Sequence, residues 1–272
     1  MFAIPFGFIG VVIGHAVFGY NIQFLSMVGT LALSGIIVND SLIMVDFIKK
    51  LRHEGKDKIT AVINAGKVRA RPIILTSVTT FLDHFFEGFD AEKIAKKLVA
   101  NYSKYADRTV ESLMKEWDDA AKYGTIVHDE IEDWIKKGTE PKDIKSINGK
   151  RWLMNYQSKF DIDVLSEIII YSTELQIAGT IDILAKDNKT DEYIIIDWKT
   201  SKKINKVSHN YKTGTHSITK NILDCNFNHY SLQLSLYRYI LEEYYNLRIR
   251  NQVIAHIKDE GVETHISPYF KK

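Results

Sequence analysis

From about residue 83 onward, two kinds of hydrophobic pattern alternate along the chain. In one, apolar residues recur every three or four positions, which is typical of helices; in the other, short runs rich in Ile and Val indicate buried strands. Helical patterns occupy residues 90–100, 109–123 and 125–137, part of 147–160, and 230–244, and strand patterns occupy 163–171, 175–186, 192–200 and 252–258. This order predicts an α/β domain with a central mixed sheet flanked by helices.

The first part of the chain has a different pattern. Met1–Tyr20 and Gln23–Ile48 are apolar on most faces, and each run is about long enough to cross a bilayer, for which roughly 20 residues suffice. The basic sequence that follows, Lys49–Arg52, would place that end in the cytoplasm. We expect an apolar helical hairpin with membrane association through residues 1–48; a buried hairpin of a soluble protein is the alternative.

Candidate chemistry appears at the strand over residues 192–200. Side chains alternate along a strand, so Asp197 and Lys199 share one face and Trp198 points to the other. The preceding strand carries Asp182, and the polar residues 187–191 between them predict a hairpin that brings Asp182 near Asp197. Two carboxylates and an ammonium suit a divalent metal beside a phosphate. A hairpin with solvated charges is the alternative reading of this triplet alone.

Three further segments add residues of the same kind. His128 lies beside the apolar stripe of its helix, four residues after Gly124, and Glu174 follows the first predicted strand. Gln233 and Tyr237 are four residues apart and share one face of the last helix.

Taken in order, these segments resemble the RecB-type branch of the PD-(D/E)XK nucleases. The resemblance runs from about Ser77 to the C-terminus, with Ile181 where the family name expects proline. It implies a restriction-endonuclease-like core and a divalent-metal-dependent DNA nuclease, an exonuclease acting in recombination, repair or viral and phage DNA processing. The implied metal is Mg²⁺, with Mn²⁺ as a substitute, and the implied partners are DNA and a helicase or recombination protein.

The resemblance also implies roles for individual residues. The metal ligands would be His128, Asp182, Asp197 and the backbone carbonyl of Trp198, with Lys199 as the catalytic lysine that orients water or offsets developing charge. Glu174 would be an acidic catalytic residue that binds a second ion or a water. Gln233 and Tyr237 would contact DNA or brace the active site.

Composition bounds this interpretation. With 36 Lys and Arg against 34 Asp and Glu, the formal charge is only +2, so a local basic patch would have to bind DNA. Lys202 and Lys203 begin a lysine-rich loop that would either track a phosphate backbone or be solvated and mobile. The single cysteine, Cys225, excludes a cysteine zinc cluster and an intramolecular disulfide, which fits a reducing compartment.

The N-terminal part resembles another family, the resistance–nodulation–division efflux transporters. The segments that carry the resemblance are Phe6–Val12, Met27–Gly29, Gly35–Asp40, Asp46–Phe47 and Arg69–Ser77. They correspond to two late membrane helices of a much larger bundle, so transport is not expected here.

Both resemblances share the string from Thr76 to Leu82, which suggests a join there. We therefore expect residues 1–76 to be a transporter-like segment foreign to the nuclease, and residues 77–272 to be a cytoplasmic nuclease domain. The alternatives are a catalytically inactive DNA-binding module of the same fold and a membrane-tethered protein related to efflux transporters.

Overall fold

The computed structural model describes residues 9, 11–13, 15–17, 19, 21, 23, 26, 45–46, 48–62, 66, 82, 84–88, 90–175 and 177–271. The chain forms two compact units, Met1–Ile73 and Ile74–Lys272. The predicted apolar hairpin and the predicted boundary near residue 76 fall largely outside the described residues. Among the residues that are described, no helix has the length and apolar character needed to span a membrane.

In the first unit, the described residues include a short helix that begins after Asp57. The Oδ1 atom of Asp57 accepts hydrogen bonds from the backbone N–H groups of Ile59 and Thr60, at 2.9 and 3.0 Å. This is the usual role of an aspartate at a helix N-cap.

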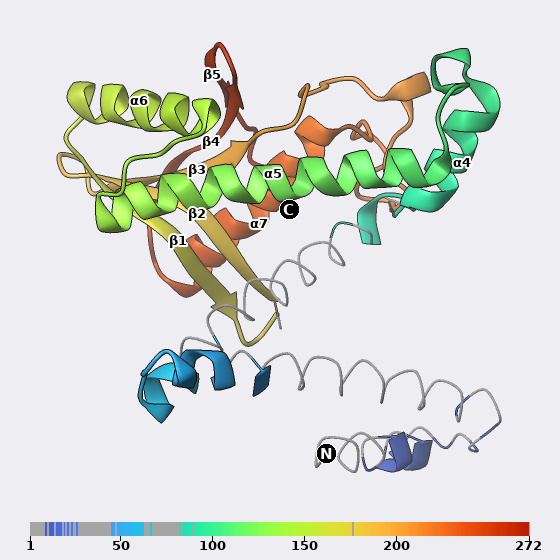
Figure 1. Cartoon of the computed structure of the whole chain (residues 1–272), viewed down its shortest axis with the longest axis horizontal. Helices are drawn as coiled ribbons and strands as arrows, with labels where there is room; N and C mark the ends of the chain where they lie inside the picture. Colours follow the sequence, from blue (N-terminus) through green and yellow to red (C-terminus); the bar gives the residue numbers. More distant parts are fainter. Residues whose placement is uncertain are drawn as a thin grey trace. The chain divides into compact units, whose positions relative to one another are not determined.

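The second unit is built on a mixed sheet of five strands in the order β1-β2-β3-β4-β5 (Figure 1). The strands are β1 (Ile162–Ser172), β2 (Ile177–Asp187), β3 (Glu192–Lys199), β4 (Ile249–Lys258) and β5 (Gly261–Ile266). β3 and β4 are parallel and the other neighbours are antiparallel. The parallel pair requires a crossover, which contains helix α7 (Asn226–Tyr244).

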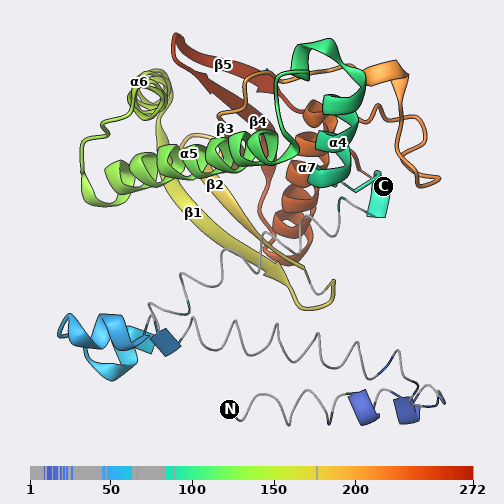
Figure 2. The ribbon, with the colours of Figure 1, turned by 45° about the vertical axis from the view of Figure 1, so that its right-hand side comes forward.

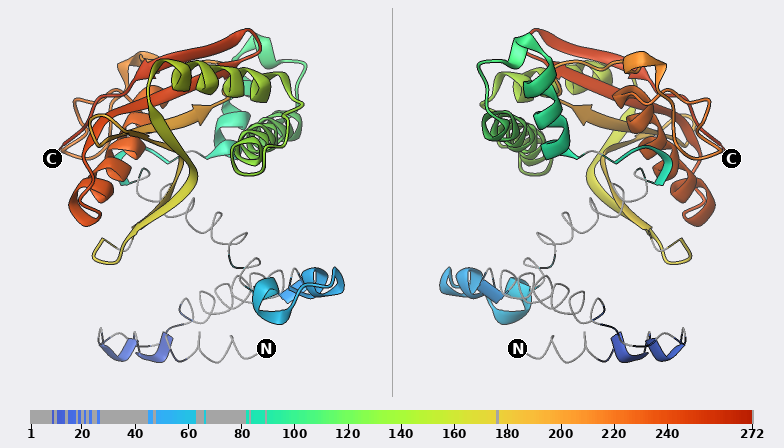
Figure 3. Two further views of the ribbon diagram at one scale, coloured as in Figure 1. Left: turned by 90° about the vertical axis from the view of Figure 1, so that its left-hand side faces the viewer. Right: turned by 90° about the vertical axis from the view of Figure 1, so that its right-hand side faces the viewer.

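Helices cover both faces of this sheet (Figures 2 and 3). α7 packs on one face, where its residues and those of the sheet form the α7-side cluster, including Ile168, Ile170, Ile181, Leu184, Ile195, Leu234, Tyr237 and Ile240. On the other face lie α5 (Val110–Lys137) and α6 (Ile144–Lys159). They contribute to the α5-side cluster, including Val127, Ile131, Leu153, Ile162, Val164, Ile183, Ile194, Ile196 and Trp198.

β3 is central in the sheet and is covered on both faces, which explains its unbroken run of isoleucines. Ile195 belongs to the α7-side cluster, whereas Ile194 and Ile196 belong to the α5-side cluster. A strand buried on both faces has no polar alternation to preserve, so every position in the run is apolar.

The predicted α/β class with a mixed sheet flanked by helices is confirmed. The restriction-endonuclease-like core remains a prediction. Two elements differ. β5 is a strand that the sequence pattern does not predict, and the helices predicted over 109–123 and 125–137 form a single helix, α5. Gly124 between them does not end the helix; termination comes at Gly138, whose backbone is left-handed with φ 70°. A short helix, α4 (Ala91–Asn101), precedes α5 and begins after the N-cap Asp90.

Candidate metal centre

Helix α5 brings His128 to the sheet by a close approach at Gly124. A Cβ atom at position 124 would lie 2.9 Å from Oγ1 of Thr200, the residue that follows β3. Without a side chain there, the helix backbone can approach the end of the strand. His128 follows one helical turn later on the same face, with 17% of its side chain exposed.

Partway along the β1–β2 hairpin, the apolar side chains of both strands switch from one face of the sheet to the other. On β2, Ile181 belongs to the α7-side cluster and Ile183 to the α5-side cluster. On β1, Ile168 and Val164 are divided between the two clusters in the same way. Residues two apart on a regular strand share a face, so both strands are irregular between these positions. Asp182 lies at the irregularity on β2.

The irregularity on β1 is Glu167. Its φ is 50°, in the left-handed region that residues other than glycine rarely adopt. The neighbours of Glu167 pair with the neighbours of Asp182 in antiparallel register, so the two acids lie across from each other. Strained backbone of this kind is concentrated at functional sites, where the surrounding structure holds it.

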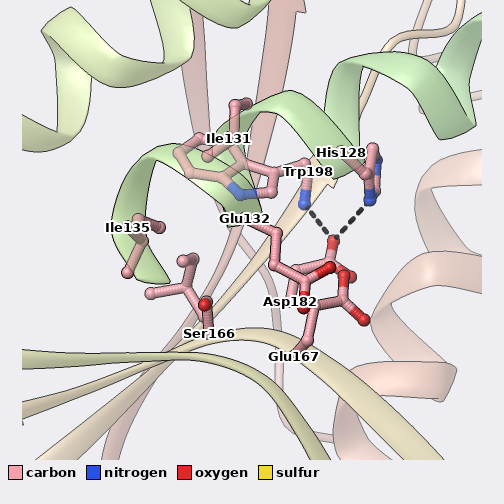
Figure 4. Close-up of a pocket in the computed structure, with 9 residues that line it drawn as sticks. His128, Ile131, Glu132, Ile135, Ser166, Glu167, Asp182 and Trp198 are labelled. Carbon is pink, nitrogen blue, oxygen red and sulfur yellow. Dashed lines mark hydrogen bonds and ion pairs between the residues drawn. The ribbon is translucent and has the colours of Figure 1, made fainter. Parts of the chain in front are cut away.

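His128, Glu167 and Asp182 meet in a pocket between α5 and the hairpin (Figure 4). One ligand atom from each residue lies within 4.8 Å of the other two. The Nδ1 atom of His128 is 3.6 Å from Oδ2 of Asp182. The same Oδ2 accepts a 2.7 Å hydrogen bond from the backbone N–H of Trp198, which fixes the orientation of the carboxylate.

The walls of the pocket are partly acidic and partly apolar. Glu132 lines it one turn beyond His128 on α5, and the side chain of Glu132 also pairs with Lys136 at 2.7 Å. Ile131, Ile183 and Trp198 provide apolar lining. Apolar surroundings strengthen the interaction between an ion and its ligands by lowering the local dielectric constant.

Asp197 and Lys199 lie on the other face of β3. Their neighbours Ile196 and Trp198 are in the α5-side cluster, so strand alternation directs Asp197 and Lys199 toward α7. The two side chains form an ion pair, and the Lys199 ammonium lies 4.7 Å from the centre of the Tyr230 ring on α7. The group of potential ligands in the pocket consists of His128, Glu167 and Asp182, and the predicted ligand Asp197 is not part of that group.

The charges on the two faces still interact. Burial raises the pKa of the Asp197 carboxyl; Lys199 opposes that shift, whereas the charge of Asp182 adds to it. Burial by itself would lower the pKa of the Lys199 ammonium, but Asp197 and Asp182 outweigh it and the pKa rises. Lys199 is therefore a firmly protonated cation that pairs with Asp197 and also feels the charge of Asp182.

Gln233 and Tyr237 brace the hairpin from α7. The side-chain amide of Gln233 donates a 3.0 Å hydrogen bond to the Tyr237 hydroxyl, and the Tyr237 ring packs directly on Gly179 of β2. Burial raises the pKa of Tyr237 to about 12. Because only 3% of Tyr237 is exposed, its position suits a bracing role better than a contact with DNA.

The other predicted residues lie apart from the pocket. Glu174 is exposed in the turn that joins β1 and β2, because β1 continues to Ser172 and leaves Glu174 beyond its end. Lys202 is exposed and pairs with Glu116 of α5 at 2.8 Å. Lys203 is also exposed, in the segment that follows β3.

Sequence reasoning missed Glu167. The available signal was a lone acid inside an apolar run, between Ser166 and Ile168. Assigning it to the site would have required the register of β1 against β2 and the left-handed backbone at Glu167, and the sequence states neither.

Comparison with known proteins concerns mainly the first part of the chain. Residues 1–85 match the AcrB/AcrD/AcrF family. The swarming motility protein SwrC of Bacillus subtilis is 35% identical over 80 residues, which are 29% of this chain and 8% of SwrC. The multidrug export protein AcrF of Escherichia coli is 32% identical over 83 residues, which are 30% of this chain and 8% of AcrF. The chain thus spans a small fraction of these relatives.

Among the solved structures that match is the crystal structure of SSO0001. The alignment covers 65% of this chain and 62% of that protein, with 12% sequence identity and a TM-score of 0.30.

Proposed function

We propose that residues 77–272 form a divalent-metal-dependent DNA nuclease that hydrolyses phosphodiester bonds, acting as an exonuclease. The observation that carries the proposal is the meeting of His128, Glu167 and Asp182 in one pocket. Of these, Asp182 lies on β2, the strand that pairs with β3, which carries the Asp197–Lys199 pair. The order of sequence motifs described above supports the same conclusion.

The donor set fits a hard divalent cation. Ligand atoms about 2.1 Å from a magnesium ion are about 3.0 Å apart when adjacent and about 4.2 Å apart when opposite. The 3.6 Å between Nδ1 of His128 and Oδ2 of Asp182 lies between these two distances. The ligand atoms of the whole group lie within 4.8 Å of one another, so the side chains would have to move only slightly closer to bind the ion. Two carboxylates and one imidazole would hold Mg²⁺ or Mn²⁺ and leave positions for water and a phosphate oxygen.

The chain's own residues would then bind and orient the phosphodiester. When bound, the cation would stabilise charge on the phosphoryl oxygens and lower the pKa of nearby water. Lys199, whose pKa is raised by Asp197 and Asp182, would act from the opposite face of β3, where its positive charge would offset negative charge that develops near Asp182. The Trp198 backbone N–H and the Gln233–Tyr237 pair hold Asp182 and the strand that carries it in place.

The proposal is tested with labelled single- and double-stranded DNA incubated with the full chain in Mg²⁺, Mn²⁺ or EDTA. We expect cleavage that depends on the metal. Asp182→Asn preserves an acceptor for the Trp198 N–H but removes the charge, and we expect the rate to fall at least about 100-fold. Lys199→Met should cause a loss of similar size. The matched control is Asp163→Asn, because Asp163 is exposed on β1 outside the pocket.

The product pattern distinguishes exonuclease from endonuclease action, because only exonuclease action requires a free end and leaves a closed circular substrate intact. Urea unfolding of each variant controls for loss of structure. Cleavage that persists in EDTA, or that is equal in the wild type and Asp182→Asn, would reject the proposed site. DNA binding without cleavage in any metal would instead favour the non-catalytic DNA-binding module.

A second candidate, a membrane-tethered nuclease, is favoured by the match of residues 1–85 to a transporter family. Expressing the full chain and residues 77–272 in parallel distinguishes a membrane-tethered nuclease from a nuclease to which residues 1–76 are foreign. If residues 1–76 are foreign, the shorter chain is soluble and active. If only the full chain cuts DNA and it sediments with membranes, the tethered form is supported.

A further inference from the structure

A second group of potential metal ligands lies on the hairpin of β4 and β5, at the edge of the sheet (Figure 2). His256 on β4 pairs directly with Glu263 on β5, and His265 follows Glu263 by two residues. Directly paired residues and residues two apart on a strand share a face, so the three side chains project from the same side of the hairpin. One ligand atom from each lies within 4.8 Å of the other two.

His256 is held in one tautomer. Its Nε2 atom is 2.6 Å from the carbonyl oxygen of Ser201, two residues beyond Lys199. A carbonyl oxygen can only accept, so Nε2 carries the hydrogen, and in the neutral ring Nδ1 carries the lone pair. An imidazole that donates one N–H to a backbone carbonyl is the usual arrangement of a metal-binding histidine. Only 2% of His256 is exposed.

His265 presents a buried nitrogen that lacks a hydrogen bond. Its side chain is 9% exposed, and its Nε2 atom has no hydrogen-bond partner among the described residues. The nearest carboxylate oxygen, Oε1 of Glu263, is 3.5 Å away. Burial lowers the pKa of His265. A buried polar atom without a partner costs free energy that a bound ion would offset.

We propose that His256, Glu263 and His265 bind a divalent transition metal of the zinc type, at a site separate from the one that contains His128. Ligand atoms about 2.05 Å from a tetrahedral zinc ion are about 3.3 Å apart, close to the 3.5 Å between His265 and Glu263. The second oxygen of Glu263 pairs with Lys258, which would steady the carboxylate while Oε1 faces the metal. Two imidazoles favour zinc, nickel or cobalt over magnesium.

The bound ion would fasten the edge of the sheet to the segment after β3. Among the strands that the structure describes, β5 pairs with β4 alone, and the His256 ring reaches across to the Ser201 carbonyl. A metal at this hairpin would therefore stabilise the position of the chain just beyond Lys199. This metal has no part in the proposed hydrolysis of DNA, and the proposal of a zinc-type site does not depend on the proposed nuclease function.

The test is a titration of the full chain with Zn²⁺ in competition with a chromophoric chelator. The parent is Asp182→Asn, in which binding at the other site is weakened. We expect this parent to bind one equivalent of Zn²⁺ that excess Mg²⁺ does not displace. His265→Phe retains an aromatic ring beside Phe227, and His256→Gln retains a donor toward the Ser201 carbonyl.

Each of these two substitutions should weaken Zn²⁺ binding at least about 100-fold, because loss of an outer-shell partner alone costs 10- to 100-fold. The matched control, His209→Gln, changes an exposed histidine and should leave the affinity unchanged. Far-ultraviolet circular dichroism without metal verifies that each variant is folded. Unaltered affinity in folded His265→Phe, or the absence of a one-equivalent site in the parent, would overturn the proposal.

Discussion

Gly179→Ala tests the contact through which α7 braces the candidate centre. A Cβ atom at position 179 would lie 2.2 Å from Cε1 of Tyr237, 2.9 Å from Cζ and 3.0 Å from Cδ1. Carbon atoms pack best at about 3.5–4.0 Å, so the ring or the strand would have to move by more than about 1 Å. The ring is buried and fixed by Gln233, which makes that movement costly.

The magnitude follows from two opposing effects. Overpacking a tight core costs about 1–3 kcal/mol, and a contact this short belongs at the upper end. Replacing glycine by alanine within a strand would otherwise stabilise by about 0.5–1 kcal/mol. We therefore expect Gly179→Ala to lower the free energy of unfolding by about 2 kcal/mol. Without the clash, the sign would be reversed.

A double-mutant cycle measured by urea unfolding isolates this contact. Tyr237→Leu removes the two nearest ring atoms, Cε1 and Cζ. In that background Gly179→Ala should be neutral or slightly stabilising, giving a coupling of about 2–3 kcal/mol between the sites. Equal costs of Gly179→Ala in both backgrounds, within about 0.5 kcal/mol, would refute the packing of Tyr237 on Gly179.

Two further predictions concern Glu167 and Asp187. Glu167→Gly relieves the strain of the left-handed backbone, so the free energy of unfolding should rise by about 1 kcal/mol. Because the substitution also removes a proposed ligand, the Mn²⁺ affinity measured by calorimetry should fall. Glu167→Gln should weaken Mn²⁺ binding without the gain in stability. The backbone N–H of Lys189 and, less strongly, Arg250 lower the pKa of Asp187 below its ordinary value of 3.8. This stabilisation is present above pH 3.8 and is lost as the pH falls through the lower pKa of the folded state. The difference in unfolding free energy between wild type and Asp187→Asn should therefore shrink in that pH range. A difference that stays constant with pH would exclude this linkage.

The parts of the fold that the sequence predicted are those decided by local patterns. The isoleucine run of β3 marks a strand buried on both faces, and the stripe containing Val127 and Ile131 marks the buried side of a helix. β5 was not predicted because its residues are mostly exposed or half-buried, as befits a strand at the edge of a sheet. Its sequence lacks the apolar alternation that identifies strands.

The candidate site was only partly predictable for the same reason. Gly124, His128 and Asp182 follow from spacing within single elements, and the structure brings them to one place. Glu167 depends on the pairing of two strands and on a backbone conformation that no local pattern reveals. The hairpin predicts that Asp197 lies near Asp182, and the charges of the two carboxylates do interact. Strand alternation directs the Asp197 side chain, with Lys199, toward α7, so its role as a metal ligand stays a prediction.

The position of the candidate centre follows from where the β2–β3 ladder stops. The last regular pair joins Ile183 to Ile196, and the next residues across the ladder are Asp182 and Asp197. Beyond that pair, the Trp198 N–H donates to the Asp182 carboxylate instead of to a strand carbonyl. A buried backbone donor needs a partner, so the end of the ladder itself holds a carboxylate in place. On β1, the left-handed backbone of Glu167 interrupts the alternation of side chains between the two faces at the position across from Asp182. The irregularity at this level of the hairpin therefore brings Glu167 and Asp182 together beside His128.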